Sequence, residues 1–548
     1  MKTLSRTVLT LFVLSFSCLA AIAGEVSFKI TKQYLNFPIS HKENRGRMTF
    51  EVNGKPDLSV VIRLAPDEAE YWVFKDVSAF KGKTIKITYD GNEKGLSKIY
   101  QSDEIEGQAE LYKEKNRPQF HFTTRRGWIN DPNGLIYYEG EYHLFYQHNP
   151  FERDWENMHW GHAVSKDLIH WTELPDALYP DHLGTMFSGS AVIDYDNTAG
   201  FNKGKTPAMV AAFTAASSDR QVQGIAYSLD KGRTFTKYDK NPVINSKEKW
   251  NSQDTRDPKV FWYAPSKHWV LVLNERDGHS IYTSSNLKDW KYESHVTGFW
   301  ECPELFELPV DGDKNHTKWV MYGATGTYML GSFDGKVFTP EAGKYCYTTG
   351  SIYAAQTFTN IPASDGRRIQ IGWGRISHSG MPFNGMMMLP TELTLRTTKD
   401  GIRLVNVPVK EVESLCKPLR SWKSLSSDEA NRHLKEFYDA DCLRIKTTIK
   451  LSHATDAGFN LFGQRMIGYD MNSNTLNGRF YSPQDPTSME LSADIYIDRT
   501  SIEVFIDGGL YSYSMERRPD TNNKEGFHFW GNRIEVKDLQ VFSVESIW

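Results

Sequence analysis

The segment WINDPNG, residues 128–134, combines a carboxylate with two amides, an indole and a turn-forming dipeptide, which is typical of a binding loop. Pro132 lacks a backbone donor and Asn133-Gly134 favours a tight turn, so we expect Asp131 to lie where a strand ends or bends. The two asparagine amides could donate hydrogen bonds that keep this carboxylate ionised. An ordinary hairpin turn with an exposed tryptophan would also produce the Asn-Gly pair, so the motif alone leaves both interpretations open.

Two further acids lie in short motifs that end in proline, RDP at 256–258 and ECP at 301–303. Glycosyl transfer needs a nucleophile, a protonated acid for the leaving oxygen, and a carboxylate that stabilises an oxocarbenium-like transition state. Asp131, Asp257 and Glu301 could supply these three groups. Each motif is weak by itself, because acids beside proline also occur in ordinary loops.

The neighbours of each acid suggest its role. Glu301 follows Phe299-Trp300, an apolar setting that, with a second carboxylate nearby, favours the protonated form of a general acid. Asp131, beside its amides, suits an ionised nucleophile. Asp257 follows Arg256 and should stay charged, although neighbours on a regular strand point to opposite faces, so a direct pair is not assured.

A repeated turn indicates the elements that would bring these acids together. Four segments share a serine, an Asp or Asn two residues later, and an aromatic residue that closes the turn: 165–171, 228–235, 284–290 and 332–338. Each follows short β-rich runs, and recurrence at roughly 50 residues favours the four-stranded blades of a propeller. A fifth unit, about 350–396, has the β-rich runs 369–374 and 393–396 but no clear copy of the turn. We therefore predict a five-bladed β-propeller over 118–400, whose innermost strands line one funnel; chance recurrence in a β-rich chain is the alternative.

The flanking segments are also β-rich, which makes the predicted fold class all-β. Residues 24–112 contain runs such as 58–64 and 83–89, and we expect an accessory β-domain that is either a structural cap or a binding module. Residues 405–548 contain runs such as 444–449 and 501–506, which indicate a β-sandwich packed on the propeller. The main helical pattern covers 427–437.

Length and composition fit an exported globular protein of several domains. The chain has 548 residues, 39% hydrophobic and 24% charged, with a formal charge of −4, and no long basic run suggests a nucleic acid partner. Lys2 and Arg6 precede an apolar run, and 21–23 supply small residues before Gly24, so 1–23 read as a signal peptide. Acylation at Cys18, giving a surface lipoprotein, is the less favoured alternative, and no later segment resembles a membrane span.

The cysteines do not indicate a metal site or a disulfide scaffold. Four remain after cleavage, Cys302, Cys346, Cys416 and Cys442, too few to staple a chain of this size, although a pair such as Cys416 with Cys442 stays open. No CxxC or HExxH spacing supports zinc.

In this order and at these separations, WINDPNG, RDP and ECP resemble the signature of glycoside hydrolase family 32, the invertases, inulinases and levanases. Further blocks extend the resemblance over about 120–548: FYQHNP at 145–150, MHWGHA at 158–163, FSGS at 187–190, YAAQ at 353–356 and DRTSIEVF at 498–505. The resemblance implies a five-bladed propeller followed by a β-sandwich. It also implies a retaining mechanism through a fructosyl-enzyme intermediate, with no metal or organic cofactor.

Carried over position by position, the resemblance implies roles for individual residues. Asp131 would be the nucleophile, Glu301 the acid/base and Asp257 the transition-state stabiliser. The substrate-contacting positions would be Trp128, Asn130, Gln147, Trp155, Phe187, Ser188 and Arg256. Core packing is the alternative for Trp155 and Phe187, and Gln147 or Ser188 could instead satisfy backbone groups.

Two departures from the family pattern leave the linkage and chain-length preference open. WEN stands at 155–157 where the family often has a Trp-Gly pair, and the segment 347–352 lacks an acid often seen there. We expect a secreted or periplasmic β-fructofuranosidase that hydrolyses fructans of levan or inulin type, and sucrose as a further candidate, from the non-reducing end. A fructosyltransferase and a non-catalytic fructan-binding protein are the rivals, and retention of all three acids argues against the second.

Overall fold

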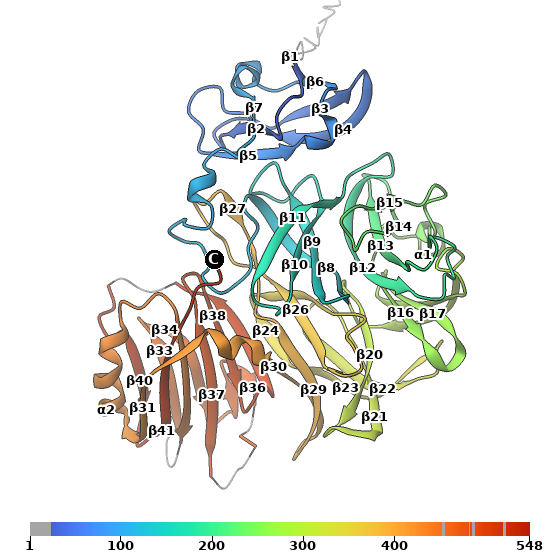
Figure 1. Ribbon diagram of the computed structural model, residues 1–548. Coiled ribbons are helices and arrows are strands. Elements are labelled where there is room, and N and C mark those ends of the chain that lie inside the picture. The colour runs from blue at the N-terminus through green and yellow to red at the C-terminus, as the bar shows by residue number, and fades with distance from the viewer. Residues whose placement is uncertain (1–23, 452–454, 482, 485–487, 519–521) are drawn as a thin grey trace, which may run out of the picture.

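The computed structural model describes residues 24–451, 455–481, 483–484, 488–518 and 522–548, which form three β-rich domains (Figure 1). The predicted all-β architecture, with a propeller followed by a sandwich and preceded by an additional β-rich domain, is confirmed. The segment interpreted as a signal peptide, with Cys18, lies outside the described residues. Among the described helices, none is long and apolar enough to cross a membrane.

The N-terminal domain consists of two antiparallel sheets that enclose their own core. One sheet has the order β1 (Gly24–Lys29), β6 (Thr84–Tyr89), β3 (Gly46–Val52), β4 (Lys55–Ile62), and the other β5 (Tyr71–Asp76), β2 (Tyr34–Ile39), β7 (Tyr100–Ser102). Short 3₁₀ turns cover Ser78–Phe80, Glu93–Lys98 and Gln108–Glu110. Alternating strand residues such as Phe37 and Ile87 are fully buried between the sheets.

The propeller has five units of four antiparallel strands. Blade 1 contains β8 (Gly127–Tyr138), β9 (Glu141–Asn149), β10 (His159–Ser165) and β11 (Trp171–Leu178). Blade 2 contains β12 (Thr185–Asp194), β13 (Ala208–Ala216), β14 (Gln221–Ser228) and β15 (Thr236–Lys237), followed by α1 (Lys247–Trp250). Blade 3 contains β16 (Thr255–Tyr263), β17 (His268–Glu275), β18 (Gly278–Ser284) and β19 (Lys291–Thr297), with a 3₁₀ turn at Ala264–Ser266.

Blades 4 and 5 are linked in one larger sheet through a parallel contact between β20 and β29. Blade 4 contains β20 (Glu304–Val310), β21 (Asp313–Tyr322), β22 (Thr327–Phe333) and β23 (Phe338–Cys346). Blade 5 contains β25 (Ile352–Thr357), β26 (Arg368–Gly374), β29 (Thr391–Thr398) and β30 (Gly401–Pro408), with the short β28 (Met386–Met387) beside β26. β27 (Phe383–Asn384) pairs with β8 and so joins blade 5 to blade 1.

The repeated turn lies between the third and fourth strands of the first four blades. In three copies the serine hydroxyl donates to the acid or amide two residues later, with Ser165–Asp167, Ser228–Asp230 and Ser284–Asn286 distances of 3.0, 2.7 and 3.1 Å. In the fourth copy Asp334 accepts from two later backbone amides. These local bonds explain why the motif recurs in each of these four blades.

The C-terminal sandwich packs a seven-stranded sheet on a five-stranded sheet. The larger sheet has the order β24 (Thr348–Gly350), β39 (Tyr511–Glu516), β38 (Ser501–Ile506), β37 (Glu490–Ile497), β32 (Leu443–Lys450), β41 (Glu535–Val544), β31 (Cys416–Ser426). The smaller has the order β36 (Arg479–Phe480), β35 (Thr475–Leu476), β34 (Gln464–Asp470), β33 (Asp456–Leu461), β40 (Phe527–Gly531). The predicted helix over 427–437 is present as α2 (Ser427–His433) and the 3₁₀ turn Leu434–Phe437, and begins with a capping box; a further 3₁₀ turn spans Lys410–Leu415.

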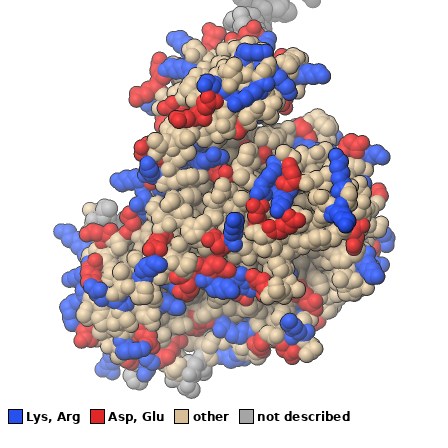
Figure 2. Space-filling model, in the orientation of Figure 1, with Lys and Arg blue, Asp and Glu red and all other residues tan. Residues whose placement is uncertain are grey.

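The domains share cores and hydrogen bonds. Ile129 and Leu144 of blade 1 lie in one buried cluster with Tyr496 and Phe505 of the sandwich, and β24 leaves the propeller to pair with β39. In Figure 1 the N-terminal domain covers one side of blade 1, and the sandwich lies beside blade 5. On the face drawn in Figure 2, basic and acidic side chains are interspersed over the three domains.

All four described cysteines are free thiols, so the disulfide left open between Cys416 and Cys442 is not formed. The Cys442 thiol lies 3.5 Å from an Asp498 carboxylate oxygen, and the Cys416 thiol lies 3.5 Å from the Val412 carbonyl oxygen.

Candidate active site

The WINDPNG segment lies entirely inside β8, the first strand of blade 1, so the hairpin alternative is wrong. The strand bends instead. Ile129 faces His148 and Pro132 faces Tyr146 across the sheet, so that Asn130 and Asp131 together oppose one residue of β9. This bulge turns the Asp131 carboxylate out of the regular alternation of side chains.

The other two acids also lie where the backbone departs from a regular strand. In β16 the register breaks between Arg256 and Lys259, and Asp257 has a φ of 65°. Glu301 and Cys302, separated from β20 by Pro303, have φ values of 50° and 43°. Left-handed backbone at such residues costs about 1–3 kcal/mol each and is frequent at functional sites.

Cys302 is the point at which two of the acids meet. Its backbone N–H donates to Asp257 Oδ2 at 3.0 Å, and its thiol lies 3.6 Å from the same oxygen and 3.7 Å from Asp131 Oδ2. Burial among carboxylates raises the pKa of the Cys302 thiol well above its usual value, so the thiol stays protonated. The sequence interpretation considered Cys302 only for disulfide pairing, although its position beside Glu301 in the ECP motif was the available signal.

Of the two asparagine amides expected to donate to Asp131, Asn130 does so, whereas Asn133 bonds to Gly189 instead, and Ser188 of blade 2 supplies a further donor. Ser188 Oγ donates to Oδ2 at 2.7 Å, and Asn130 Nδ2 donates to Oδ1 at 3.1 Å. Trp128 Nε1 donates to Asn130 Oδ1 at 2.7 Å and fixes that amide. Burial nevertheless raises the pKa of Asp131, while the bonds from Ser188 and Asn130 oppose the shift.

The expectation that Asp257 stays charged is wrong below neutral pH. Its residue is 6% exposed, and burial raises the pKa of its carboxyl group to about 7. The Arg256 charge opposes this rise, whereas the charges of Asp131 and Glu301 add to it. Desolvation and two neighbouring carboxylates therefore outweigh one adjacent guanidinium.

Glu301 has polar surroundings rather than the apolar setting expected from Phe299-Trp300. Arg256 donates to Glu301 Oε1 from Nη2 at 2.8 Å and from Nε at 3.2 Å, and Tyr353 Oη donates to Oε2 at 2.6 Å. Both carboxylate oxygens are therefore held by donors from blades 3 and 5. Tyr353 belongs to the YAAQ block of the family resemblance, which gave no indication of a contact with Glu301.

The predicted substrate-contacting residues lie around the three acids, but they differ in what they contact. Trp128, Asn130, Ser188 and Arg256 contact an acid or one of its direct partners. The Gln147 amide donates to the Met186 carbonyl oxygen at 2.9 Å, so this side chain does satisfy a backbone group.

Trp155 and Phe187 lie at the edge of the cluster. Trp155 is 49% exposed and meets Phe187 edge-to-face with the ring centroids 5.9 Å apart, so core packing does not account for Trp155. Phe187 directly precedes Ser188 on β12. Within the described part of the chain, the one close group of potential metal ligands, His41, Glu152 and Asp154, involves none of the three acids.

Comparison with known proteins places this site in a family. The glycosyl hydrolases family 32 N-terminal domain matches residues 121–408, and the family 32 C-terminal domain matches 411–543. A levanase of Bacillus subtilis is 40% identical over 491 residues, covering 80% of this chain and 72% of that protein. An extracellular exo-inulinase of Aspergillus niger is 37% identical over 521 residues, covering 80% and 96%.

A solved structure agrees with the sequence comparisons. The crystal structure of an exo-inulinase from Aspergillus awamori has a TM-score of 0.69 and 29% identity, covering 80% of this chain and 100% of that chain. The chain therefore belongs to glycosyl hydrolase family 32 and is a glycoside hydrolase, as the WINDPNG, RDP and ECP motifs predicted.

Proposed function

We propose that this family 32 enzyme is a retaining β-fructofuranosidase that releases fructose from the non-reducing end of fructans. The meeting of Asp131 and Asp257 at the Cys302 thiol, with Glu301 the residue before Cys302, is the observation that carries the proposal. The levanase and exo-inulinase relatives support fructans as the substrate class.

In the first step the Asp131 carboxylate attacks the anomeric carbon while Glu301 gives a proton to the glycosidic oxygen, and the leaving sugar departs. The bonds from Ser188 and Asn130 orient Asp131 for this attack.

In the second step Glu301 takes a proton from water, whose oxygen attacks the anomeric carbon of the fructosyl-Asp131 ester. The bond between that carbon and Asp131 breaks, the Asp131 carboxylate is restored, and fructose leaves with its configuration retained. Arg256 and Tyr353 keep the Glu301 carboxylate in place through both transfers. Asp257 has no general acid or base role in this scheme; it engages fructosyl hydroxyl groups as positive charge develops on the ring.

Export is part of the proposal. Residues 1–23 have the composition of a cleaved signal peptide, and a relative is an extracellular exo-inulinase. An extracellular or periplasmic enzyme would meet polymeric fructan before it is degraded to small sugars.

Separate incubations with levan, inulin and sucrose, with products resolved by chain length over time, test the function and settle the linkage. Fructose should be the first small product from at least one polymer, and NMR of the initial product should show the retained anomer. A ladder of intermediate oligomers would reject the exo mode, and absence of hydrolysis on all three substrates would reject the function.

A further inference from the structure

The segment between β9 and β10 connects the N-terminal domain to the edge of the active site. We call residues 151–157 the Trp155 loop. Phe151, its first residue, is 1% exposed and lies in the core of the N-terminal domain, with ring centroids 6.1 Å from Phe37 and 6.2 Å from Phe50. A residue of the catalytic domain therefore completes the core of the additional domain.

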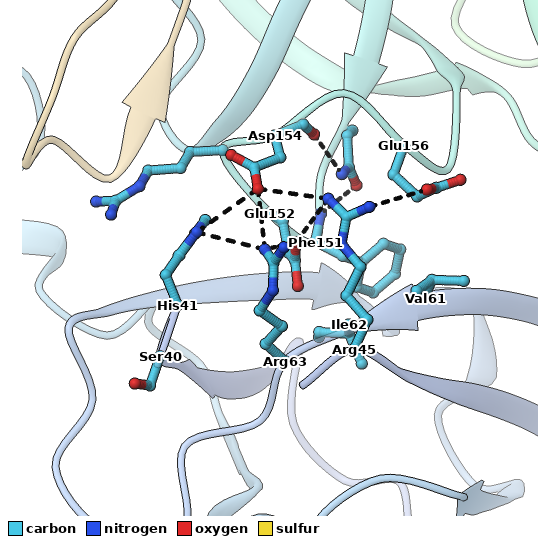
Figure 3. Close-up of polar contacts among 12 residues, drawn as sticks. Ser40, His41, Arg45, Val61, Ile62, Arg63, Phe151, Glu152, Asp154 and Glu156 are labelled. Atoms are coloured by element: carbon cyan, nitrogen blue, oxygen red, sulfur yellow. Dashed lines mark hydrogen bonds and ion pairs between the residues drawn. The ribbon is translucent and has the colours of Figure 1, made fainter. Parts of the chain in front are cut away.

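Three acids of the loop pair with two arginines of the N-terminal domain (Figure 3). Arg63 Nη1 lies 2.7 Å from Glu152 Oε2 and 2.9 Å from Asp154 Oδ2. Arg45 Nη2 lies 3.4 Å from Asp154 Oδ2, and its Nη1 lies 3.2 Å from Glu156 Oε2. Arg45 thus bonds to the residues immediately before and after Trp155.

Arg63 also occupies the place that a metal ion would take. His41, Glu152 and Asp154 offer ligand atoms close together, but Arg63 Nη1 lies 3.3 Å from His41 Nδ1 and bonds to both acids. Glu152 is fully buried, and Arg45 Nη2 also lies 3.5 Å from its Oε2, so the two arginines together compensate this acid in the interface. The cluster is an internal ion-pair network.

The remaining loop side chains make further contacts with the same domain. Asn157 accepts from Val61 N and donates to Val61 O, both at 2.8 Å, in the manner of a neighbouring strand. The Arg153 guanidinium lies over the Tyr71 ring, 5.1 Å from its centroid, and donates to Glu70 at 3.2 Å.

Trp155 differs from its neighbours because its ring contact is with the catalytic domain. It meets Phe187, and the next residue, Ser188, bonds to Asp131. Asp257 is buried and Asp131 and Glu301 are half-buried, whereas Trp155 is 49% exposed. In an exo-acting enzyme the terminal fructosyl unit lies against the three acids, so this exposed indole, which is linked to Asp131 through Phe187 and Ser188, is available to the sugar beyond the cleaved bond.

We propose that the N-terminal domain determines the affinity of the active site for the leaving sugar, by holding Trp155 where its indole stacks on that sugar. Arg45 and Arg63 are the positioning residues, and neither touches the reacting atoms. The N-terminal domain therefore contributes to substrate binding through the Trp155 loop and needs no ligand site of its own. This inference rests on the proposed fructan hydrolysis.

The test compares Arg45→Ala with Arg47→Ala in the full-length protein. Arg47 lies two residues away, is exposed, and its side chain contacts Ser59 of its own sheet at 3.5 Å, so it is a matched control. Two substrates separate the effects: a trisaccharide with two fructosyl units, and methyl β-fructofuranoside, which has no leaving sugar. For Arg45→Ala we expect the ratio of kcat/KM on the trisaccharide to that on the methyl fructoside to fall about five-fold, mainly through KM.

A double-mutant cycle with Trp155→Ala tests whether Arg45 affects substrate binding through Trp155. If Arg45 acts through Trp155, the double variant should show the trisaccharide loss of Trp155→Ala alone, within about two-fold. Arg45→Lys keeps a positive charge and should recover part of the ratio. Thermal unfolding of each variant checks that the fold is retained.

An unchanged ratio in Arg45→Ala, or additive losses in the cycle, would overturn the inference while leaving fructan hydrolysis standing. Failure of the wild-type enzyme on both fructosides would instead reject the proposed function.

Discussion

The Arg256 guanidinium pairs with Glu301, at 2.8 Å from Nη2 to Oε1, and not with Asp257, its neighbour in the chain. The bulge in β16 turns the Asp257 carboxylate away from its neighbour and toward Cys302. One arginine therefore acts on three acids: it bonds directly to Asp254 and Glu301, and its charge limits the rise in the pKa of Asp257.

Arg256→Gln should lower kcat/KM on fructan by about 100-fold, because a charge-assisted fork to Glu301 is lost and the pKa of Asp257 rises further. Arg256→Lys keeps the positive charge without the paired hydrogen bonds of the guanidinium, so its kcat/KM should lie between those of the wild-type enzyme and Arg256→Gln. Steady-state kinetics from pH 4 to 8 measure both. If the lysine and glutamine variants are equally impaired, charge is not what Arg256 contributes.

Asp131→Asn and Glu301→Gln should each reduce kcat by at least about 1,000-fold, because a nucleophile and an acid contribute mainly in the transition state. The neutral replacements keep the shape of the site, so thermal unfolding should show no loss of stability. Removal of the Asp131 charge should also lower the pKa of Asp257, since that charge is one cause of its rise. Near-wild-type turnover in either variant would reject the assigned role.

Ser188→Ala should move the acid limb of the kcat/KM profile toward neutral pH by roughly half a pH unit or more. The Ser188 hydroxyl donates to the ionised form of Asp131 and lowers its pKa, so removing the hydroxyl raises that pKa. A nucleophile must be ionised, and activity is then lost at a higher pH on acidification. Ser188→Thr, which keeps a hydroxyl group, is the control, and an unmoved acid limb in Ser188→Ala would show that the bond does not tune Asp131.

Asp257→Asn should stabilise the protein increasingly as the pH rises. The folded pKa of Asp257 is about 7 and the ordinary value is 3.8, so between these values the native carboxyl keeps a proton that the unfolded chain releases. The native state then binds more protons, and the free energy of unfolding falls as the pH rises through this window. Asn does not titrate, so its melting temperature should exceed the wild-type value by a few degrees at pH 7.5 and by less at pH 4.5. An equal difference at both pH values would contradict the raised pKa.

The parts of this molecule that were predictable from sequence depend on local bonds or on topology. The turn with Ser165 and Asp167 closes within two residues, so its repetition was visible and indicated the blades. The convergence of the three acids was predictable because the inner strands of a propeller line one funnel. The protonation of Asp257 was not predictable, because its burial and its distance from other charges are set by contacts between blades.

Two contacts that the sequence did not predict also join distant parts of the fold. Tyr353 reaches Glu301 from blade 5. Arg45 reaches Glu156 from a separate domain. Neither pair has a spacing in the chain that a motif could reveal.

Gly134 is the residue of the opening motif whose replacement should test how tightly β8 sets the site. It has a φ of 53°, and an added Cβ would lie 2.8 Å from the Phe145 ring and 3.1 Å from the Trp160 ring. Both rings are fully buried and cannot move without opening the core. Gly134→Ala should therefore destabilise the protein by about 2–3 kcal/mol and, by shifting the strand that carries Asp131, lower kcat as well.

Gly140→Ala separates steric crowding from backbone strain. Gly140 also has a positive φ, 86°, but an added Cβ there meets nothing within 4 Å. This control should cost about 1 kcal/mol and leave kcat unchanged, because only conformational preference is affected. Equal losses of stability in the two variants, measured by thermal or urea unfolding, would show that packing of Phe145 and Trp160 against β8 does not determine the position of Asp131.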